Sequence, residues 1–147
     1  MKLLSVSACA LIALGLSAAG VRADEATFKS PTGNINCLYS DFDAKPEVRC
    51  DILQFVPSFK TVPAGASNEV MACTPARLHG FTVTPTGLKG AAFCPTDAVV
   101  DMDAIVLAYG NSWSRSGITC KSETSGMTCA NAAGHGFFLS KAQQKVF

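Results

Sequence analysis

Residues 117–140, GITCKSETSGMTCANAAGHGFFLS, combine two cysteines, the spacing of a β-hairpin and a histidine between two glycines. A four-residue loop over residues 123–126 would place Cys120 directly opposite Cys129 on the flanking strands. Threonine precedes each cysteine and suits a half-buried pleated surface, and Gly126 can adopt the positive φ that tight hairpin loops favour. The stretch therefore predicts a hairpin closed by a disulfide between Cys120 and Cys129.

Short apolar runs between turn-prone clusters continue through the rest of the chain. Proline, glycine, asparagine and serine separate these runs, and no long helical period appears. We read residues 98–107 as a loop that turns into a strand. The pattern predicts an all-β fold, mainly antiparallel, in the form of a small barrel or sandwich. The expected strands span residues 35–39, 48–53, 70–73, 78–83, 105–109, 118–122, 127–131 and 137–139.

One short helix is expected at the C-terminus. Ser140 can cap its first turn, and Gln143, three residues later, can complete a capping box. Lys141, Lys145 and Phe147 would then follow on one or two turns of helix.

The first residues have the three parts of an export signal. Lys2 supplies a positive start, an apolar run follows over residues 3–19, and residues 21–23 have the small-x-small form of a cleavage site. The apolar run is shorter than the roughly 20 residues that a membrane-spanning helix needs. We therefore predict a signal peptide at residues 1–23, then a single domain at residues 24–147 without a membrane span, in a periplasmic or secreted location.

Removal of the signal leaves an even number of cysteines, which in an exported chain indicates a disulfide framework. Six cysteines allow 15 pairings. We favour the sequential pairing because each neighbouring pair of cysteines brackets a turn. The loop-closure entropy would make each such bridge worth roughly 2.5–3.5 kcal/mol of stability. The expected pairs are Cys37–Cys50, Cys73–Cys94 and Cys120–Cys129.

The charge of the chain is nearly balanced, with 12 Lys and Arg against 11 Asp and Glu. There is no basic stripe of the kind that attracts nucleic acid. The sequence contains no phosphate loop, dinucleotide fingerprint or nucleophile elbow. We therefore expect no nucleic-acid partner and no cofactor, and we expect a monomer.

Gly134-His135-Gly136 is the first candidate for chemistry, because histidine titrates near neutral pH and glycine lets a ligand approach the backbone. The alternative, which we favour, is that His135 hydrogen-bonds a backbone carbonyl and locks a bulge before the next strand. A metal site is not expected, because His79 is the only other histidine and no zinc-type cysteine spacing occurs.

Three aspartates resemble the opening of a calcium loop but lack the glycine that such a loop needs at its sixth position. They are Asp97, Asp101 and Asp103. We interpret this group as a solvated acidic turn.

Residues 109–115 form a polar loop that holds the only tryptophan of the chain. Aromatic side chains beside arginine can stack on sugars or anchor a protein partner. The alternative is that Trp113 closes one end of the core. The motifs at Tyr109 and Gly134 flank the C-terminal hairpin, so we expect a ligand-binding surface at one end of the domain, formed by Tyr109, Trp113, Arg115 and His135.

Five segments carry a resemblance to a known family: FKSPTGNINC at 28–37, VRCDI at 48–52, LAYG at 107–110, GMTCAN at 126–131 and GHGFFLS at 134–140. Together they resemble an uncharacterised family of bacterial exported proteins, catalogued as domain of unknown function 6636. The resemblance implies an exported domain with paired cysteines, and it carries no established activity, catalytic residue or ligand. Lys141 departs from the family pattern, because similar sequences tend to have arginine there.

These observations predict an exported or envelope-associated accessory protein that binds an envelope protein, a glycan or an enzyme that it inhibits. No catalytic residue is assigned, and we expect a binding role rather than an enzymatic one. The alternative is a small secreted hydrolase with His135 as general base and Ser116, Ser140 or Asp97 nearby. A hydrolase needs a nucleophile and an orienting group within hydrogen-bond reach of His135, whereas a binding module needs only a suitable surface.

Overall fold

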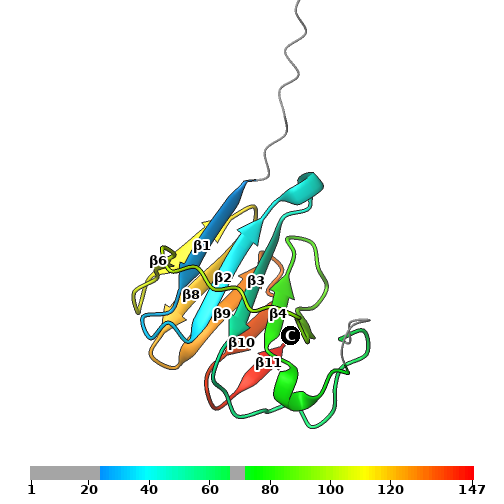
Figure 1. The fold of residues 1–147 in the computed structure, drawn as a ribbon. Helices are drawn as coiled ribbons and strands as arrows, with labels where there is room; N and C mark the ends of the chain where they lie inside the picture. The colour runs from blue at the N-terminus through cyan, green and yellow to red at the C-terminus, as the bar shows by residue number, and fades with distance from the viewer. Residues whose placement is uncertain (1–23, 67–71) are drawn as a thin grey trace, which may run out of the picture.

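The computed structural model describes residues 24–66 and 72–147, and the predicted signal peptide lies outside these residues. The described strands form two β-sheets (Figure 1). The first has the strand order β5-β4-β3-β2-β1-β6. Its members are β1 (Glu25–Lys29), β2 (Ile35–Ser40), β3 (Glu47–Ile52), β4 (Gly80–Val83), β5 (Ala91–Phe93) and β6 (Ile105–Val106).

The second sheet is antiparallel throughout and has the order β11-β10-β9-β8-β7. In the first sheet only the short β6 is parallel to its neighbour, β1, among the described strands. The fold is therefore all-β and mainly antiparallel, as predicted, and the described strands do not close into one barrel. The second sheet contains β7 (Ser112–Arg115), β8 (Ile118–Glu123), β9 (Gly126–Asn131), β10 (Gly136–Leu139) and β11 (Gln144–Val146).

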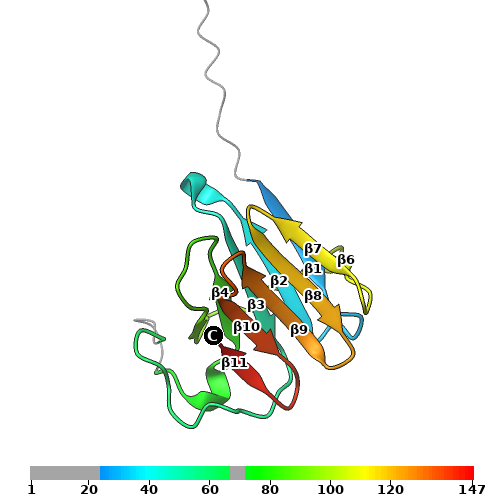
Figure 2. The same ribbon diagram turned by 180° about the vertical axis from the view of Figure 1, so that it is seen from behind.

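The two sheets face each other, the first in front in Figure 1 and the second in front in Figure 2. Phe81 of β4 and Phe137 of β10 meet across the interface with ring centroids 6.0 Å apart. Alternate residues of the longer strands, most regularly in β8 and β9, point into this shared core, which follows from the period of two in a β-strand. The buried core includes Phe28, Tyr39, Val48, Ile52, Phe81, Val83, Ile118, Met127, Phe137 and Leu139.

Three disulfides join the predicted sequential pairs, Cys37–Cys50, Cys73–Cys94 and Cys120–Cys129. The first bridges directly opposite residues of β2 and β3, and the third bridges directly opposite residues of β8 and β9. These two bridges meet in the core, where the sulfur atoms of Cys50 and Cys129 lie 3.8 Å apart. The sulfurs thus link the two sheets by contact as well as linking strands by covalent bonds.

The predicted C-terminal helix is wrong, because the chain reverses after Ser140 and returns as β11. The Ser140 hydroxyl does accept a hydrogen bond from the Gln143 N–H, as in a helix cap. However, the Ser140 and Gln143 backbones also bond to each other in both directions, which closes a two-residue hairpin loop. The same local spacing serves a turn here because β10 offers β11 a partner.

The predicted 120–129 hairpin is present, with a shorter loop. Glu123 pairs with Gly126, so the loop contains two residues rather than four. The strands β1, β5, β7 and β11 were not predicted, since they are short or mostly polar. The strand expected over residues 70–73 lies partly outside the described residues, and its described part, Ala72 and Cys73, is not in a strand.

The connection from β5 to β6 crosses the outer face of the first sheet (Figure 1). We call its residues 95–104 the strap. Polar side chains of the sheet hold it: the Thr27 hydroxyl donates to the Asp101 carboxylate, and Lys29 Nζ lies 2.9 Å from the Met102 carbonyl. This hydrogen bond from Thr27 is the main reason that the pKa of Asp101 lies below its usual value. Asp101 is therefore held against the sheet, whereas Asp97 and Asp103 are exposed, as predicted for a solvated turn.

No helix in the described ranges has the length and apolar character needed to cross a membrane. The described helical residues are confined to two short 3-10 turns, Phe42–Ala44 and Pro75–Arg77.

Candidate functional site

A cleft of about 430 Å³ lies at the end of the two sheets where three hairpin turns converge. Its volume falls in the range of roughly 300–1,000 Å³ that is usual for small-molecule sites. The first sheet and its turns contribute Ser30, Thr32, Gly33, Asn34, Ile35, Leu53 and Gln54. The opposite wall contains Ser122, Glu123, Thr124, Ser125, Gly126, Ser140 and Lys141, and Tyr109 comes from the segment before β7.

The turn between β1 and β2 builds one wall. Gly33 takes a φ of 68°, which glycine adopts without strain, and its N–H donates to the Ser30 carbonyl at 2.8 Å. The Asn34 side chain then ties this turn to the end of β3. Its amide nitrogen donates to the Gln54 carbonyl, and its oxygen accepts from the Gln54 N–H. The wall is therefore fixed before any ligand arrives.

The opposite wall consists of the β8–β9 and β10–β11 turns. A Cβ atom at Gly126 would lie 2.3 Å from the Leu139 carbonyl oxygen, so this position admits only glycine. The Lys141 carbonyl accepts a hydrogen bond from the Val56 N–H at 2.8 Å, which anchors the second turn. Two glycine positions and several backbone bonds thus set the shape of the cleft.

Tyr109 supplies the aromatic surface of the cleft. Its side chain is 45% exposed, and the next residue, Gly110, donates its N–H to the Ser122 carbonyl at 2.7 Å. This bond holds the segment that carries Tyr109 against β8. An exposed ring beside hydroxyl and amide groups can stack on an apolar face while its neighbours make hydrogen bonds.

The ionisable side chains of the cleft, apart from Tyr109, are Glu123 and Lys141. Glu123 is paired with Lys121 at 2.8 Å. Among the described residues, neither a histidine nor a cysteine lines the cleft. The lining offers hydroxyl and amide groups and one ammonium group, which can form hydrogen bonds with a polar ligand.

A model of the protein family DUF6636, described as a family of unknown function, matches residues 8–147. The chain belongs to the DUF6636 family. This confirms the resemblance that the sequence motifs indicate. No curated protein and no solved structure matches the chain.

Four of the five segments that carry the resemblance to DUF6636 meet at the cleft. Residues 28–37 contribute the β1–β2 turn, and residues 107–110 contribute Tyr109. Residues 126–131 contribute Gly126, and residues 134–140 contribute Ser140. The cleft therefore gathers motif residues that are far apart in the sequence.

The DUF6636 fold does not bring the four predicted surface residues to one end. β8 and β9 pair from Ile118 opposite Asn131 to Glu123 opposite Gly126. Tyr109 lies at the Gly126 end, whereas Arg115 pairs with Ile118 at the other end. A strand of this length spans roughly 17–20 Å, so the two side chains belong to different surfaces.

The side chains of Trp113 and Arg115 both contact other residues of the protein. Trp113 is half-buried and stacks on Phe28 with ring centroids 4.8 Å apart, as expected for a residue that closes the core. Arg115 forms an ion pair with Asp24 at 2.8 Å and lies over the Tyr39 ring. Arg115 also lines a second, more open hollow of about 690 Å³ on the outer face of the second sheet.

His135 lies at the same end as Arg115, in the turn between β9 and β10. Its N–H donates to the Asn131 side chain and its carbonyl accepts from the Asn131 N–H, and in the described part of the chain its hydrogen bonds are all made by the backbone. The flanking glycines have structural reasons. Gly134 has a φ of 83°, and a Cβ at Gly136 would lie 1.9 Å from the Cys129 carbonyl oxygen.

The three residues considered beside His135 for a hydrolase, Ser116, Ser140 and Asp97, are located by other contacts. The Ser116 hydroxyl is 2.7 Å from the Tyr39 hydroxyl, and the Ser140 hydroxyl accepts from Gln143. The Asp97 carbonyl accepts from Arg49 on the outer face of the first sheet. The described hydrogen bonds therefore connect none of the three to the His135 imidazole.

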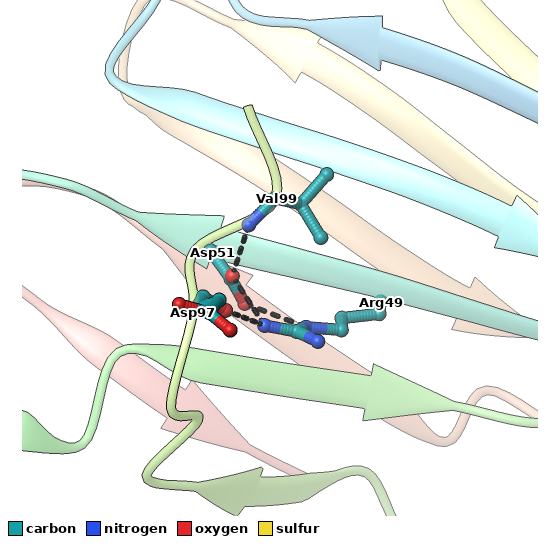
Figure 3. Close-up of polar contacts among 4 residues, drawn as sticks. All are labelled: Arg49, Asp51, Asp97 and Val99. Carbon is teal, nitrogen blue, oxygen red and sulfur yellow. Dashed lines mark hydrogen bonds and ion pairs between the residues drawn. The ribbon is translucent and has the colours of Figure 1, made fainter. Parts of the chain in front are cut away.

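A buried charge that the sequence does not reveal lies beneath the strap (Figure 3). The Asp51 side chain is fully buried and receives two hydrogen bonds from Arg49, at 3.0 and 2.7 Å. The Val99 N–H donates to the same carboxylate at 2.6 Å, and Arg49 also donates to the Asp97 carbonyl. Arg49 further lies over the Phe93 ring. This cluster fastens the strap to β3.

His79 lies near this cluster, immediately before β4. Its Nδ1 atom is buried and has no hydrogen-bond partner in the described part of the protein. Burial lowers the pKa of His79, and the Asp51 carboxylate opposes this effect in part. The folded protein therefore favours the neutral imidazole.

The sulfur atoms of Cys37, Cys50 and Cys129 lie within 4.8 Å of one another, close enough to hold a metal ion if they were free thiolates. All three are in disulfides, however, and a disulfide sulfur is not the thiolate that binds metals. This DUF6636 core uses its sulfurs for cross-linking and packing.

Proposed function

We propose that this protein is an exported accessory protein of the cell envelope that binds a glycan in the cleft at the end of its sheets. In this proposal the two facing sheets act as a β-sandwich scaffold, and the turns carry the binding surface. The observation that carries the proposal is the convergence on the cleft of four of the segments that carry the sequence resemblance.

The chemistry of the lining supports a glycan. Hydroxyl groups of Thr32, Thr124 and Ser125 can both donate and accept hydrogen bonds, as sugar hydroxyls do. The half-exposed ring of Tyr109 provides a flat apolar face for a sugar ring. Such a combination of one aromatic platform and several neutral polar groups is typical of a small-ligand site.

The disulfides support export. Three bridges in one small domain are typical of proteins that mature in an oxidising compartment, such as the periplasm or the extracellular space. A predicted signal peptide at residues 1–23 agrees with this location. Detection of the oxidised protein beginning at Asp24 in the periplasm or the medium would support export, and a cytoplasmic full-length protein would contradict it.

Binding without turnover is favoured over hydrolysis. A hydrolase would need His135 to share a site with a nucleophile. Ser140 lies at the cleft, whereas His135 hydrogen-bonds Asn131 at the far end of β9. A ligand in the cleft would therefore meet no histidine.

A substitution at Tyr109 tests the proposed function. We would titrate the oxidised protein with neutral, acidic and amino-sugar oligosaccharides by calorimetry, and repeat the titration of each binder with Tyr109→Ala. Loss of the stacking surface should weaken binding about three- to tenfold. Phe42→Ala is the matched control, because Phe42 is also an exposed ring, 67% accessible, but does not line the cleft.

Two outcomes would contradict the proposal. One is that no oligosaccharide binds at millimolar concentration to a protein whose disulfides are intact. The other is that Tyr109→Ala and Phe42→Ala weaken binding equally, which would place the glycan elsewhere.

A further inference from the structure

We infer that the cleft selects an anionic glycan, one whose sugar carries a carboxylate as uronic acids do, through the ammonium group of Lys141. This inference rests on the proposed glycan-binding function and adds the charge of the ligand to it. The inference depends on two charged groups of the cleft: the Glu123 carboxylate, which is paired with a lysine, and the Lys141 ammonium group.

The one acidic side chain of the cleft has a partner. The Glu123 carboxylate lies 2.8 Å from Lys121 Nζ, and the two side chains are 44% and 51% exposed. Lys121 lies on the outer face of the second sheet, so it compensates Glu123 from outside the cleft. The carboxylate therefore contributes little net charge toward a ligand.

Among the described residues, Lys141 has no such partner. It lines the cleft, its side chain is exposed, and no described acidic group forms an ion pair with it. An ammonium group donates hydrogen bonds and accepts none, so it complements a carboxylate better than a hydroxyl. The cleft thus presents one uncompensated positive charge beside neutral polar groups.

The backbone of Lys141 is held in place. Ser140 and Gln143 bond to each other in both directions, at 2.7 and 3.3 Å, and close the two-residue loop that carries Lys141. The bond from the Val56 N–H to the Lys141 carbonyl adds a third anchor. Only the side chain must be ordered on binding, which lowers the entropic cost of using it.

The neutral groups around Lys141 explain why the ligand is a sugar acid rather than a simple anion. Tyr109 offers a ring, and the Gln54 side chain and the loop hydroxyls of Thr124 and Ser125 offer donors and acceptors. A small inorganic anion would leave most of these groups unused. A uronic acid would place its carboxylate at Lys141 and its hydroxyls along the remaining wall.

The test compares three disaccharides that differ in charge: digalacturonate, neutral digalactose and cationic dichitosan. We expect digalacturonate to bind about fivefold more tightly than digalactose at low salt, which is the upper range for one exposed ion pair. Lys141→Gln should reduce this preference to less than about twofold, and about 0.5 M NaCl should reduce it in the native protein. Dichitosan should bind most weakly.

Lys145→Gln is the matched control, because it removes the same charge from an exposed β11 residue outside the cleft. It should leave the preference for digalacturonate unchanged. If both lysine variants reduce the preference equally, the effect comes from overall charge and the inference is wrong.

The inference and the proposed function fail in different ways. If digalactose and digalacturonate bind equally and Tyr109→Ala weakens both, the glycan-binding function stands and the charge selection is overturned. If none of the three sugars binds to the oxidised protein, and the wider oligosaccharide panel gives no binder either, the proposed function itself is overturned.

Discussion

At the scale of single residues, Asp51 shows most clearly how burial and charge oppose each other in this protein. A carboxylate without solvent is costly unless other groups replace the water. Arg49 and the Val99 N–H do so here, with contacts of 2.6–3.0 Å. The period-two pattern of β3 places Asp51 on the outer face, and only the strap makes that face an interior.

The first prediction concerns this ion pair. Asp51→Asn keeps an acceptor for Val99 but removes the charge that Arg49 faces, and it should lower the free energy of unfolding by about 2–4 kcal/mol. Urea unfolding at neutral pH measures the loss. Asp24→Asn is the control, since the Asp24–Arg115 pair is solvent-exposed and should contribute no more than about 0.5 kcal/mol. If both variants lower the free energy of unfolding by the same amount, the Asp51–Arg49 pair is as solvent-exposed as the Asp24–Arg115 pair, and the prediction is wrong.

The second prediction concerns His79 and pH. Because burial lowers the pKa of His79 in the folded state, the unfolded chain takes up this proton at a higher pH than the folded chain. Stability should therefore fall as the pH drops below about 6.5, the ordinary histidine value, and the decline should end below the lowered folded-state pKa. Urea unfolding between about pH 5 and pH 8 measures this dependence.

His79→Gln should flatten that part of the pH profile, because the variant carries no imidazole at this half-buried position. His135→Gln removes the other histidine and leaves His79 in place, so it should retain the decline. If His135→Gln flattens the profile and His79→Gln does not, the pH dependence of stability arises from His135, and the prediction for His79 is wrong.

At the scale of elements, the strap and the C-terminal hairpin show how the surroundings override local sequence. The segment Ser140 to Gln143 carries a helix-capping signal, yet pairing with β10 makes it a hairpin turn. The aspartates of the strap read as a solvated turn, and Asp97 and Asp103 are indeed exposed. The segment is nevertheless tied to the sheet, because Thr27 bonds the Asp101 side chain and Lys29 bonds the Met102 carbonyl. In both cases a partner distant in sequence decides the conformation.

The third prediction concerns the attachment of the strap. Thr27→Val preserves the shape of the side chain and removes the hydroxyl that donates to Asp101. Amide hydrogen exchange should become faster across residues 99–104 while the exchange of β2 and β9 stays unchanged. Ser114→Ala is the control, because it breaks the hydroxyl contact with Thr119 on the second sheet and should leave the strap unaffected. Unchanged exchange in the strap of Thr27→Val would show that Asp101 is held by other contacts.

At the scale of the whole molecule, the disulfides divide into a core set and a peripheral bridge. Cys37, Cys50, Cys120 and Cys129 are at most 1% exposed. Cys73 is only partly buried, although its partner Cys94 is buried at the edge of the core, and neither residue lies in a strand. A reductant must reach a sulfur atom to attack it, so access should set the order of reduction.

The fourth prediction is that order. Under mild dithiothreitol at neutral pH, the Cys73–Cys94 bridge should open first and leave the domain folded. The two core bridges should open only when the sheets separate, with an unfolding signal that coincides with their loss, because each contributes roughly 2–4 kcal/mol. Timed alkylation with mass mapping, recorded beside circular dichroism, checks this. Alkylation of Cys120 or Cys129 in a protein with native circular dichroism would contradict it.

Local sequence patterns established the β class and predicted the register of Cys120 against Cys129, and they favoured the sequential disulfide pairs that the structure confirms. These features depend on period-two patterning, turn residues and cysteine spacing, which are local or nearly local. The sequence also identified Tyr109, because an aromatic residue in a glycine-containing loop is a visible pattern. Three features became visible only in the folded protein: Tyr109 lies far from Arg115, Lys141 lines the cleft, and Asp51 is buried. Those facts depend on which turns meet at one end and on which face the strap covers, and such long-range packing leaves no local signal in the chain.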